Sequence, residues 1–555
     1  MDILNQVLYL LALFISVVVL ARLLDRRNTW SEFPMEDRLY NAVLIFFALA
    51  AVFVRVYKFG LVPGGFNQDG AMAAVDAKAL ADYGTDRYGM SYPVHLTAWG
   101  YGQMSALLSY LMVPFIKLMG LNPFSARLPQ LIVSLLGLAV LYLFARDAFG
   151  KKAALVIFAF VAIAPWHILQ SRWALDCNLY PHFFLFGIFF LNRSLKSKHR
   201  RLMLCLAMVM FGLCMYCYGV SIYTMPLFLL MSCIYLLTKK LLRPTEALLA
   251  GLAWLAVAWP FILVMAINYF GWDTIEIGPL TLPYFSDSVR SNDILFFSED
   301  FAAQLWENLK SLQSTVFAQG KDLPWNNIPA FGSIYMFSIP FAVLGFVWTL
   351  LRSKENPGAA LLMFFFITGL WCGICTNGVN INRINIIFYP QIIFTALGIY
   401  TVICCIRAFP VRLGLAAAYL LSFALLCSTY FGSYAQQMDY YFFKDFGSAV
   451  SALKYSDAEK FYITGKSQGE NTIQVSEILT LFYHEVDAEY YQGKSCPEGL
   501  LPYEQRYTYG DMEYLTIDPE EDAAYIAAAS ELNCFDLELY DVSQYGTYYL
   551  LERKD

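Results

Sequence analysis

The chain contains the apolar run LIVSLLGLAVLYL at residues 131–143, and the basic residues Arg146 and Lys151 follow it closely. Similar runs at Val43–Val54 and Leu202–Met215 are also flanked by Lys and Arg. A membrane-spanning helix needs about 20 mainly apolar residues, and basic residues gather at its cytoplasmic end. Hydrophobic residues make up 58% of the 555 residues, above the roughly 45–50% of soluble domains. The sequence therefore predicts a polytopic α-helical membrane protein.

The basic clusters predict how the helices are oriented, because Lys and Arg favour the cytoplasmic side. We place six clusters inside: 22–38, 146–152, 193–201, 239–243, 352–354 and 407–412. About twelve spans then connect them, with both termini outside: 3–23, 39–58, 127–146, 152–168, 178–193, 202–218, 221–238, 246–268, 331–351, 359–376, 384–406 and 413–431. The first span has no preceding basic region and no cleavage site, which favours a retained helix over a signal peptide.

The apolar stretch Met104–Met119 does not fit this count, because a crossing there would place the cluster 193–201 outside. It contains a proline and a lysine, which suits a helix that lies along the membrane surface. The first outer loop is then 59–126, with two juxtamembrane helices at Gly70–Tyr83 and about Gln103–Leu118. The other predicted outer loops are 165–178, 269–330 and 377–383.

The C-terminal segment differs in charge from the rest. Residues 432–555 hold 23 acidic and 8 basic residues, and short runs such as Phe461–Thr464 and Tyr548–Leu551 alternate with turn residues. This pattern predicts a small extracytoplasmic α/β domain, and its acidity argues against a nucleic-acid partner. Its two cysteines, Cys496 and Cys534, can pair if the domain lies outside. We divide the chain into an extra N-terminal span with a cytoplasmic loop (1–38), a membrane domain (39–431) and this soluble domain (432–555).

The first outer loop brings a carboxylate to the membrane surface. It reads FNQDG at residues 66–70, and the helix that follows contains Asp76, Lys78 and Asp82. Asp69 lies where that helix begins, so it is either an N-cap that accepts backbone N–H bonds or a base that takes a proton from an attacking hydroxyl. Both roles fit the sequence.

The second outer segment reads PWHILQSRWALD at residues 165–176, which is unusually polar for a short link between spans. Polar groups at this depth are usually paired or functional. Arg172 and Asp176 are four residues apart and form either an ordinary helix pair or part of a site. His167 has too few histidine neighbours for a zinc site. Asp69 with Asp176 would give a divalent cation only two carboxylate side chains.

The third outer segment reads NGVNINRIN at residues 377–385 and places Asn382 and Arg383 at the outer mouth of a span. Arg383 is either an interface anchor or a ligand for a lipid-linked phosphate, which arginine grips with two N–H groups. Arg127 is a second candidate of the same kind. Nucleotide-driven and protease chemistry have no support, because no P-loop, GxGxxG, HExxH or Ser/His/Asp pattern occurs at a credible position.

These segments, taken in order, resemble the GT-C superfamily of polyprenyl-phosphate-dependent glycosyltransferases. The similar branch is that of the protein O-mannosyltransferases and the lipid A aminoarabinose transferase. The resemblance covers roughly residues 40–405. It rests on NQD at 67–69 with Asp76, on GTDRYG at 84–89, on the two juxtamembrane helices, and on PWH at 165–167 with Ser171, Arg172 and Asp176.

The resemblance implies an inverting transfer of a sugar from a polyprenyl-phosphate donor to an extracytoplasmic acceptor, which is a protein, a lipid or a cell-wall glycan. It implies Asp69 as the general base and Asp176 as a second acidic position. The family commonly has Asp-Glu in the first loop, whereas Gly70 follows Asp69 here. The phosphate contacts are then Arg383 with Arg127 or Arg172.

The resemblance also implies that His167 and Asn382 contact the substrate. It implies no certain cofactor, with a divalent cation as an alternative. The expected location is the plasma membrane, with many spans and with the active site and the C-terminal domain on the outer side.

Two other classes of protein fit parts of this pattern. A transporter or lipid flippase also has many spans with intramembrane Arg and Asp, but transporters tend to show repeated halves and broken helices at the midplane. A lipid-linked oligosaccharide ligase or polymerase acts on related substrates, but its usual signature is a large late outer loop with paired arginines. Here the Asp-bearing loop comes first, which favours the glycosyltransferase.

The predicted topology is testable by cysteine labelling. Single cysteines near positions 122 and 500, with Cys496 and Cys534 replaced by serine, should both react with a membrane-impermeant reagent in intact cells. Labelling of only one of the two positions would contradict the orientation derived from the basic clusters.

Overall fold

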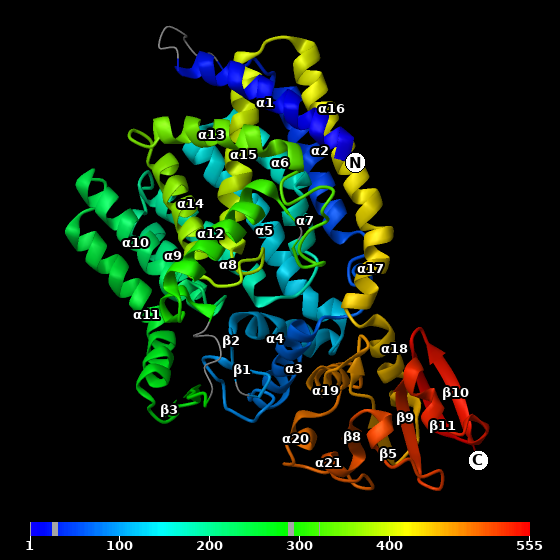
Figure 1. The fold of residues 1–555 in the computed structure, drawn as a ribbon. Helices are drawn as coiled ribbons and strands as arrows, with labels where there is room; N and C mark the ends of the chain where they lie inside the picture. The colour runs from blue at the N-terminus through cyan, green and yellow to red at the C-terminus, as the bar shows by residue number, and fades with distance from the viewer. Residues whose placement is uncertain (1, 25–31, 101, 287–292, 321, 555) are drawn as a thin grey trace.

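The structure is a computed structural model that describes residues 2–24, 32–100, 102–286, 293–320 and 322–554. Figure 1 shows a bundle of long helices, with the shorter helices α3 and α4 and a C-terminal sheet beneath it. The helices up to residue 430 other than α3 and α4 are α1 (Asp2–Leu24), α2 (Asp37–Val56), α5 (Pro123–Phe149), α6 (Lys151–Ile163), α7 (Pro165–Gln170), α8 (Tyr180–Ser194), α9 (Arg200–Leu213), α10 (Ser221–Thr238), α11 (Pro244–Phe270), α12 (Phe301–Gln313), α13 (Ile339–Arg352), α14 (Pro357–Cys375), α15 (Phe388–Cys405) and α16 (Phe409–Tyr430).

Eight helices of the described chain are long and apolar enough to cross a membrane, namely α1, α2, α5, α10, α11, α14, α15 and α16. They coincide with eight predicted spans. The other four predicted spans overlap the shorter helices α6, α8, α9 and α13, which have 13 to 15 residues. The predicted span 152–168 is interrupted at Ala164, whose backbone is extended because Pro165 follows it. The polytopic helical class is confirmed, and the number twelve stays a prediction.

The first loop forms two helices, α3 (Gln68–Tyr83) and α4 (Leu107–Met119), which pack on each other. Asn67 caps α3, because its side-chain oxygen accepts the N–H of Gly70 at 3.2 Å. The N-cap alternative for Asp69 is therefore wrong, since Asp69 lies inside the first helical turn. A negative side chain is still favoured there by the partial positive charge of the helix N-terminus.

Two short antiparallel hairpins connect the helices. β1 (Leu96–Ala98) pairs with β2 (Gly102–Met104), and β3 (Ile275–Ile277) pairs with β4 (Leu280–Leu282). The second helix of the first loop therefore begins later than the predicted Gln103, which belongs to β2.

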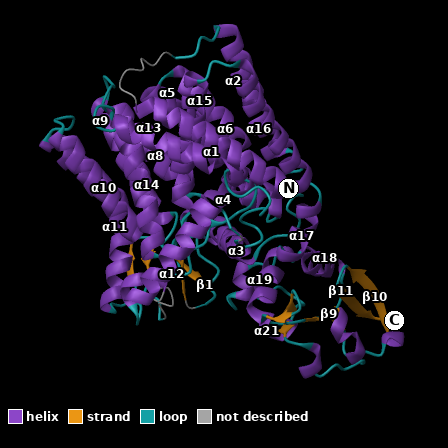
Figure 2. Cartoon of the chain, turned by 45° about the horizontal axis from the view of Figure 1, so that its top comes forward, coloured by secondary structure: helices purple, strands orange, loops and turns teal. Residues whose placement is uncertain are grey.

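The C-terminal segment contains a five-stranded mixed sheet with the strand order β10-β11-β9-β5-β8, and Figure 2 shows this sheet at one end of a mainly helical molecule. The central strand β9 (Ala523–Ala528) is buried along its whole length, so both of its faces are covered. Cys496 and Cys534 are both free, so the disulfide alternative is wrong for this structure. The remaining elements are α17 (Ser433–Tyr441), α18 (Lys444–Ala452), β5 (Lys460–Ile463), β6 (Lys466–Ser467), β7 (Glu470–Asn471), α19 (Ile473–Tyr483), α20 (Ala488–Tyr491), α21 (Tyr503–Arg506), β8 (Tyr507–Tyr509), β10 (Tyr540–Tyr545) and β11 (Tyr548–Arg553).

The C-terminal segment packs against the start of α3. The rings of Phe66 and Phe482 stack with their centroids 4.6 Å apart. The N–H of Phe66 donates to the carbonyl of Phe442 at 2.6 Å. At the other end of α3, the hydroxyl of Tyr83 donates to Asp487 at 2.8 Å. Two segments that are distant in the sequence therefore enclose the helix that carries Asp69.

Arg172 is fully buried, and all five N–H groups of its guanidinium have partners. They donate over 2.7 to 3.2 Å to the carbonyls of Val54, Arg55, Tyr57 and Val62 and to the hydroxyl of Tyr430. The carbonyls lie at the end of α2 and just after it, where a helix leaves carbonyls without partners of its own. Residues 171–175 are not helical, so the predicted helix pair with Asp176 is wrong. The predicted phosphate role of Arg172 is corrected as well, because its donors are already used.

Arg127 binds main-chain carbonyls in the next part of the segment that connects α2 to α3. It is fully buried, and it donates to the carbonyls of Pro63 at 2.8 Å, Gly60 at 3.3 Å and Gly65 at 2.6 Å. Its guanidinium also lies over the ring of Phe66, 5.3 Å from the centroid. Arg127 is therefore a structural residue rather than the predicted phosphate ligand. Together the two arginines hold the main chain that leads from α2 to Asp69.

Replacing Arg172 by lysine should destabilise the fold, because an ammonium has three N–H donors for five acceptors. We expect a loss of about 3 kcal/mol, since each charged hydrogen bond contributes about 1.5–3 kcal/mol. Thermal unfolding of the detergent-purified protein would show a lowered Tm. Arg193→Lys is the matched control, because Arg193 is half exposed and pairs with Asp147 at 2.9 Å, and such pairs contribute about 0–1 kcal/mol. Equal Tm values for the two variants would contradict the structural role of Arg172.

Candidate active site

The two predicted acidic residues lie near each other around Cys177. Burial raises the pKa of the Cys177 thiol well above its ordinary value, and the nearby negative charges of Asp176 and Asp69 raise this pKa further. Asp69 and Asp176 are both partly exposed, whereas Cys177 is buried. The first and second predicted outer segments therefore approach each other near Cys177, and each carries a partly exposed carboxylate.

The backbones of these two segments approach closely at Gly70. A Cβ atom added to Gly70 would lie 2.9 Å from the carbonyl oxygen of Ala174, which is too close for a carbon without a shift of the main chain. This contact gives a physical reason for glycine at the position where the resembling family has glutamate. A side chain there would force the main chain at Gly70 and Ala174 apart.

The turn that carries Asp176 is held by Asn385, at the end of the third predicted segment. The side-chain amide of Asn385 donates to the side-chain oxygen of Asn178 at 2.9 Å and to the carbonyl of Cys177 at 3.3 Å. The indole N–H of Trp166 in turn donates to the side-chain oxygen of Asn385 at 2.7 Å. The second and third predicted polar segments are thus joined at η1 (Asp176–Asn178) and η7 (Asn385–Ile387), and the first segment approaches the second at Gly70.

Arg383 lies two residues before Asn385 and is partly exposed, at 28% of its side chain. Its guanidinium donates to Asp293 at 3.1 Å and to the carbonyl of Asn377. Asn382 beside it is also partly exposed. Of the three predicted phosphate-binding arginines, Arg383 is therefore the one whose charge a lipid headgroup can reach.

His167 lies inside the helical bundle, away from any exposed surface. Its Nδ1 is 3.0 Å from a guanidinium nitrogen of the buried Arg55, and its Nε2 is 3.0 Å from the hydroxyl of Tyr389. That hydroxyl is 2.7 Å from Nδ1 of His182. The predicted substrate contact at His167 is therefore corrected, because these groups form a buried network between α2, α7, α8 and α15.

The sequence argument missed Asn385 and Arg55. Asn385 stood in the segment NGVNINRIN, but an asparagine at the mouth of a span is not distinguishable from a surface residue by type alone. Arg55 had a clearer signal, because it is a charge inside the predicted span 39–58, where an unpaired charge is costly. It donates to the carbonyls of Ala51 at 2.9 Å and Ala162 at 3.0 Å, which fixes α2 against α6.

A metal site of three or more His, Cys, Asp or Glu side chains does not occur among the described residues. Two carboxylates alone do not define a cation site, so the divalent cation stays a prediction. The segments provide two partly exposed carboxylates and an accessible guanidinium. These are the groups that a transfer from a phosphate leaving group to a hydroxyl requires.

Residues 105–266 match the family model described as dolichyl-phosphate-mannose-protein mannosyltransferase. No curated protein is similar enough in sequence to match the chain.

Solved structures share the fold at low identity. The ArnT protein from Cupriavidus metallidurans in the apo state is 14% identical with a TM-score of 0.53, over 92% of this chain and 97% of that one. The same protein bound to undecaprenyl phosphate also has a TM-score of 0.53 and 14% identity, over 93% and 98%. An Archaeoglobus fulgidus oligosaccharyltransferase tethered to an acceptor peptide is 13% identical with a TM-score of 0.51, over 80% of this chain and 63% of that one. Residues 105–266 are therefore similar in sequence to the protein mannosyltransferase family, and the fold of the chain is similar to that of ArnT.

Proposed function

We propose that the protein transfers a sugar from a polyprenyl-phosphate-linked donor to an acceptor hydroxyl on the outer side of the plasma membrane. The observation that carries this proposal is the close approach, at Gly70 and Ala174, of the two segments that carry the partly exposed carboxylates Asp69 and Asp176. A lipid phosphate as the leaving group is supported by ArnT, which has the same fold and was solved with undecaprenyl phosphate.

Asp69 acts as the general base in this proposal. The acceptor oxygen forms a bond to the anomeric carbon while the bond from that carbon to the phosphate oxygen breaks. The phosphate leaves with the electron pair, and Asp69 takes the proton of the attacking hydroxyl. Attack from the side opposite the phosphate inverts the anomeric centre. Asp176, close by, orients the acceptor hydroxyl toward Asp69.

Arg383 and Asn382 stabilise the charge that develops on the departing phosphate. Arg383 is the accessible member of the predicted arginines, and its pairing with Asp293 holds its guanidinium in place before the donor binds. Arg172 and Arg127 contribute indirectly, because they fix the connection that leads to Asp69. The acidic C-terminal segment packs against α3. Its negative charge supports an outer orientation for this segment and for α3.

Replacing Asp69 by asparagine should lower transfer by about 10²–10⁴-fold, because the amide keeps the shape but cannot accept the proton. Purified enzyme with a polyprenyl-phosphate sugar measures the rate, and retained donor binding shows that the fold is intact. Asp82→Asn is the matched control on the same helix, since Asp82 is partly exposed and pairs with Lys78 four residues away. Near-normal transfer by the Asp69 variant would leave Asp176 as the next candidate base.

Asp76 is unsuitable as that control. It is buried and accepts hydrogen bonds from the main chain and the guanidinium of Arg87, at 3.0 and 2.5 Å. Its substitution would leave a buried arginine without its partner, which costs about 3–5 kcal/mol.

Replacing Arg383 by glutamine should weaken use of the donor, because one charged hydrogen-bond partner of the phosphate is lost. We expect kcat/KM for the lipid-linked sugar to fall about tenfold or more, from the roughly 1.5–3 kcal/mol of such a bond. The acceptor KM should change little. An unchanged kcat/KM for the donor would remove Arg383 from the site.

A further inference from the structure

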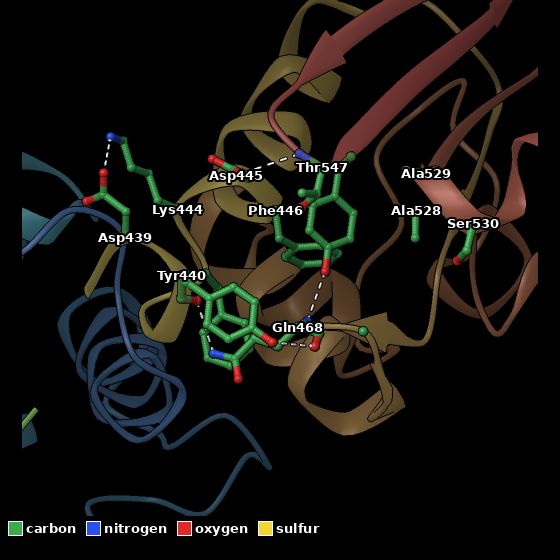
Figure 3. A pocket seen from close by; sticks show the side chains of 13 residues that line it. Asp439, Tyr440, Lys444, Asp445, Phe446, Gln468, Ala528, Ala529, Ser530 and Thr547 are labelled. Carbon is green, nitrogen blue, oxygen red and sulfur yellow. Dashed lines mark hydrogen bonds and ion pairs between the residues drawn. The ribbon is translucent and has the colours of Figure 1, made fainter. Parts of the chain in front are cut away.

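A cavity of about 250 Å³ opens between the helices that leave the bundle and the C-terminal sheet. One wall is the junction of α17 and α18, and the other is formed by the end of β9 and the start of β11 (Figure 3). In Figure 3 Ser530 lies on the opposite side of the view from the Asp439 and Lys444 pair. The cavity is separate from the space around Asp69 and Asp176, whose residues do not line it.

The floor of the cavity is aromatic and its rim is polar. Phe443, Phe446 and Tyr548 are buried, at 7%, 0% and 5% exposure, and form the floor. Gln468 and Ser530 belong to the more exposed rim. Ligand sites commonly combine apolar and aromatic walls with a few placed polar groups. A sugar ring has apolar C–H faces and polar hydroxyl edges, so it could contact both the aromatic floor and the polar rim.

The charges at the rim disfavour a phosphate. Lys444 is paired with Asp439 at 2.6 Å. Asp445 adds a second carboxylate, which accepts the N–H of Thr547 at 3.3 Å. The three charged groups that line the cavity therefore sum to one negative charge. A lipid phosphate donor would be repelled, whereas a neutral or aminated ligand would not.

The shape of the cavity disfavours an extended peptide. Peptides that add to a sheet pair along an open edge strand, and the edge strands of this sheet, β10 and β8, contribute no residue to the cavity. The volume of about 250 Å³ lies below the roughly 300–1,000 Å³ typical of pockets for drug-sized ligands, which suits one sugar ring.

We propose that this cavity binds an uncharged or aminated sugar ring of the acceptor, so that the acceptor is a glycan or a glycolipid. This inference rests on the proposed function. The cavity wall also contacts the catalytic connection, because Asp439 and Lys444 pack against Gly64 and the carbonyl of Phe442 accepts the N–H of Phe66. A bound acceptor sugar therefore supports the chain segment that delivers Asp69.

The test uses the full-length protein in nanodiscs with methyl glycosides of mannose, glucose, galactose and glucosamine as probes. Saturation-transfer NMR reports binding, and inorganic phosphate is tested as a competitor. Ser530→Trp places a large ring at the rim of the cavity. Ser543→Trp is the matched control, because Ser543 is exposed on β10 and does not line the cavity.

We expect at least one methyl glycoside to bind. Its affinity should fall about tenfold or more, or about 1.4 kcal/mol, in Ser530→Trp, and it should be unchanged in Ser543→Trp. Phosphate should not compete. The absence of binding by all four probes, or equal binding by the two variants, would overturn the proposal, as would stronger binding of a Ser/Thr peptide than of any glycoside. Transfer with no sugar binding would refute only the proposal that this cavity binds the acceptor. Sugar binding without transfer from any lipid-linked donor would refute only the proposed function.

Discussion

The guanidinium of Arg172 satisfies four main-chain carbonyls at and after the end of α2, and the site depends on this contact. A helix that ends inside a membrane protein leaves carbonyls that water cannot reach, and each unsatisfied group is costly there. One planar cation with five N–H groups meets this need at a single point. The chain can then turn away from α2 and, with Arg127 holding residues 60–65, enter α3 at a fixed place.

Burial separates the polar residues into two groups with different roles. Arg172, Arg127 and His167 are fully buried, and their hydrogen bonds go to main chain or to other buried side chains. Asp69 and Arg383 are partly exposed and stand at the ends of elements that the first group fixes. The buried arginines and His167 therefore make the structure rigid. The partly exposed groups are those that can contact the substrate. A base must be held at a defined position to be effective.

Sequence reasoning predicted the helical class, most of the long spans and the two loop helices, because apolar length and basic flanks are strong signals. It did not separate the roles of the arginines, since a guanidinium binds a carbonyl and a phosphate oxygen equally well and burial is not visible in a sequence. The N-cap was assigned to Asp69 as one alternative because Asn67 and Asp69 are both good caps. The roles of Asn385 and of the cavity in the C-terminal segment depend on contacts between distant segments, for which a single sequence gives no pattern.

The most direct measurement is a cryo-EM structure of the protein in nanodiscs with a polyprenyl phosphate. The account predicts that the phosphate binds within hydrogen-bond distance of Arg383, with Asp69 and Asp176 facing the side from which an acceptor attacks. It also predicts that Arg172 keeps its carbonyl partners from Val54 to Val62 when the lipid binds. A phosphate bound by Arg172 or Arg127, or one on a face of the bundle away from Asp69, would contradict the account.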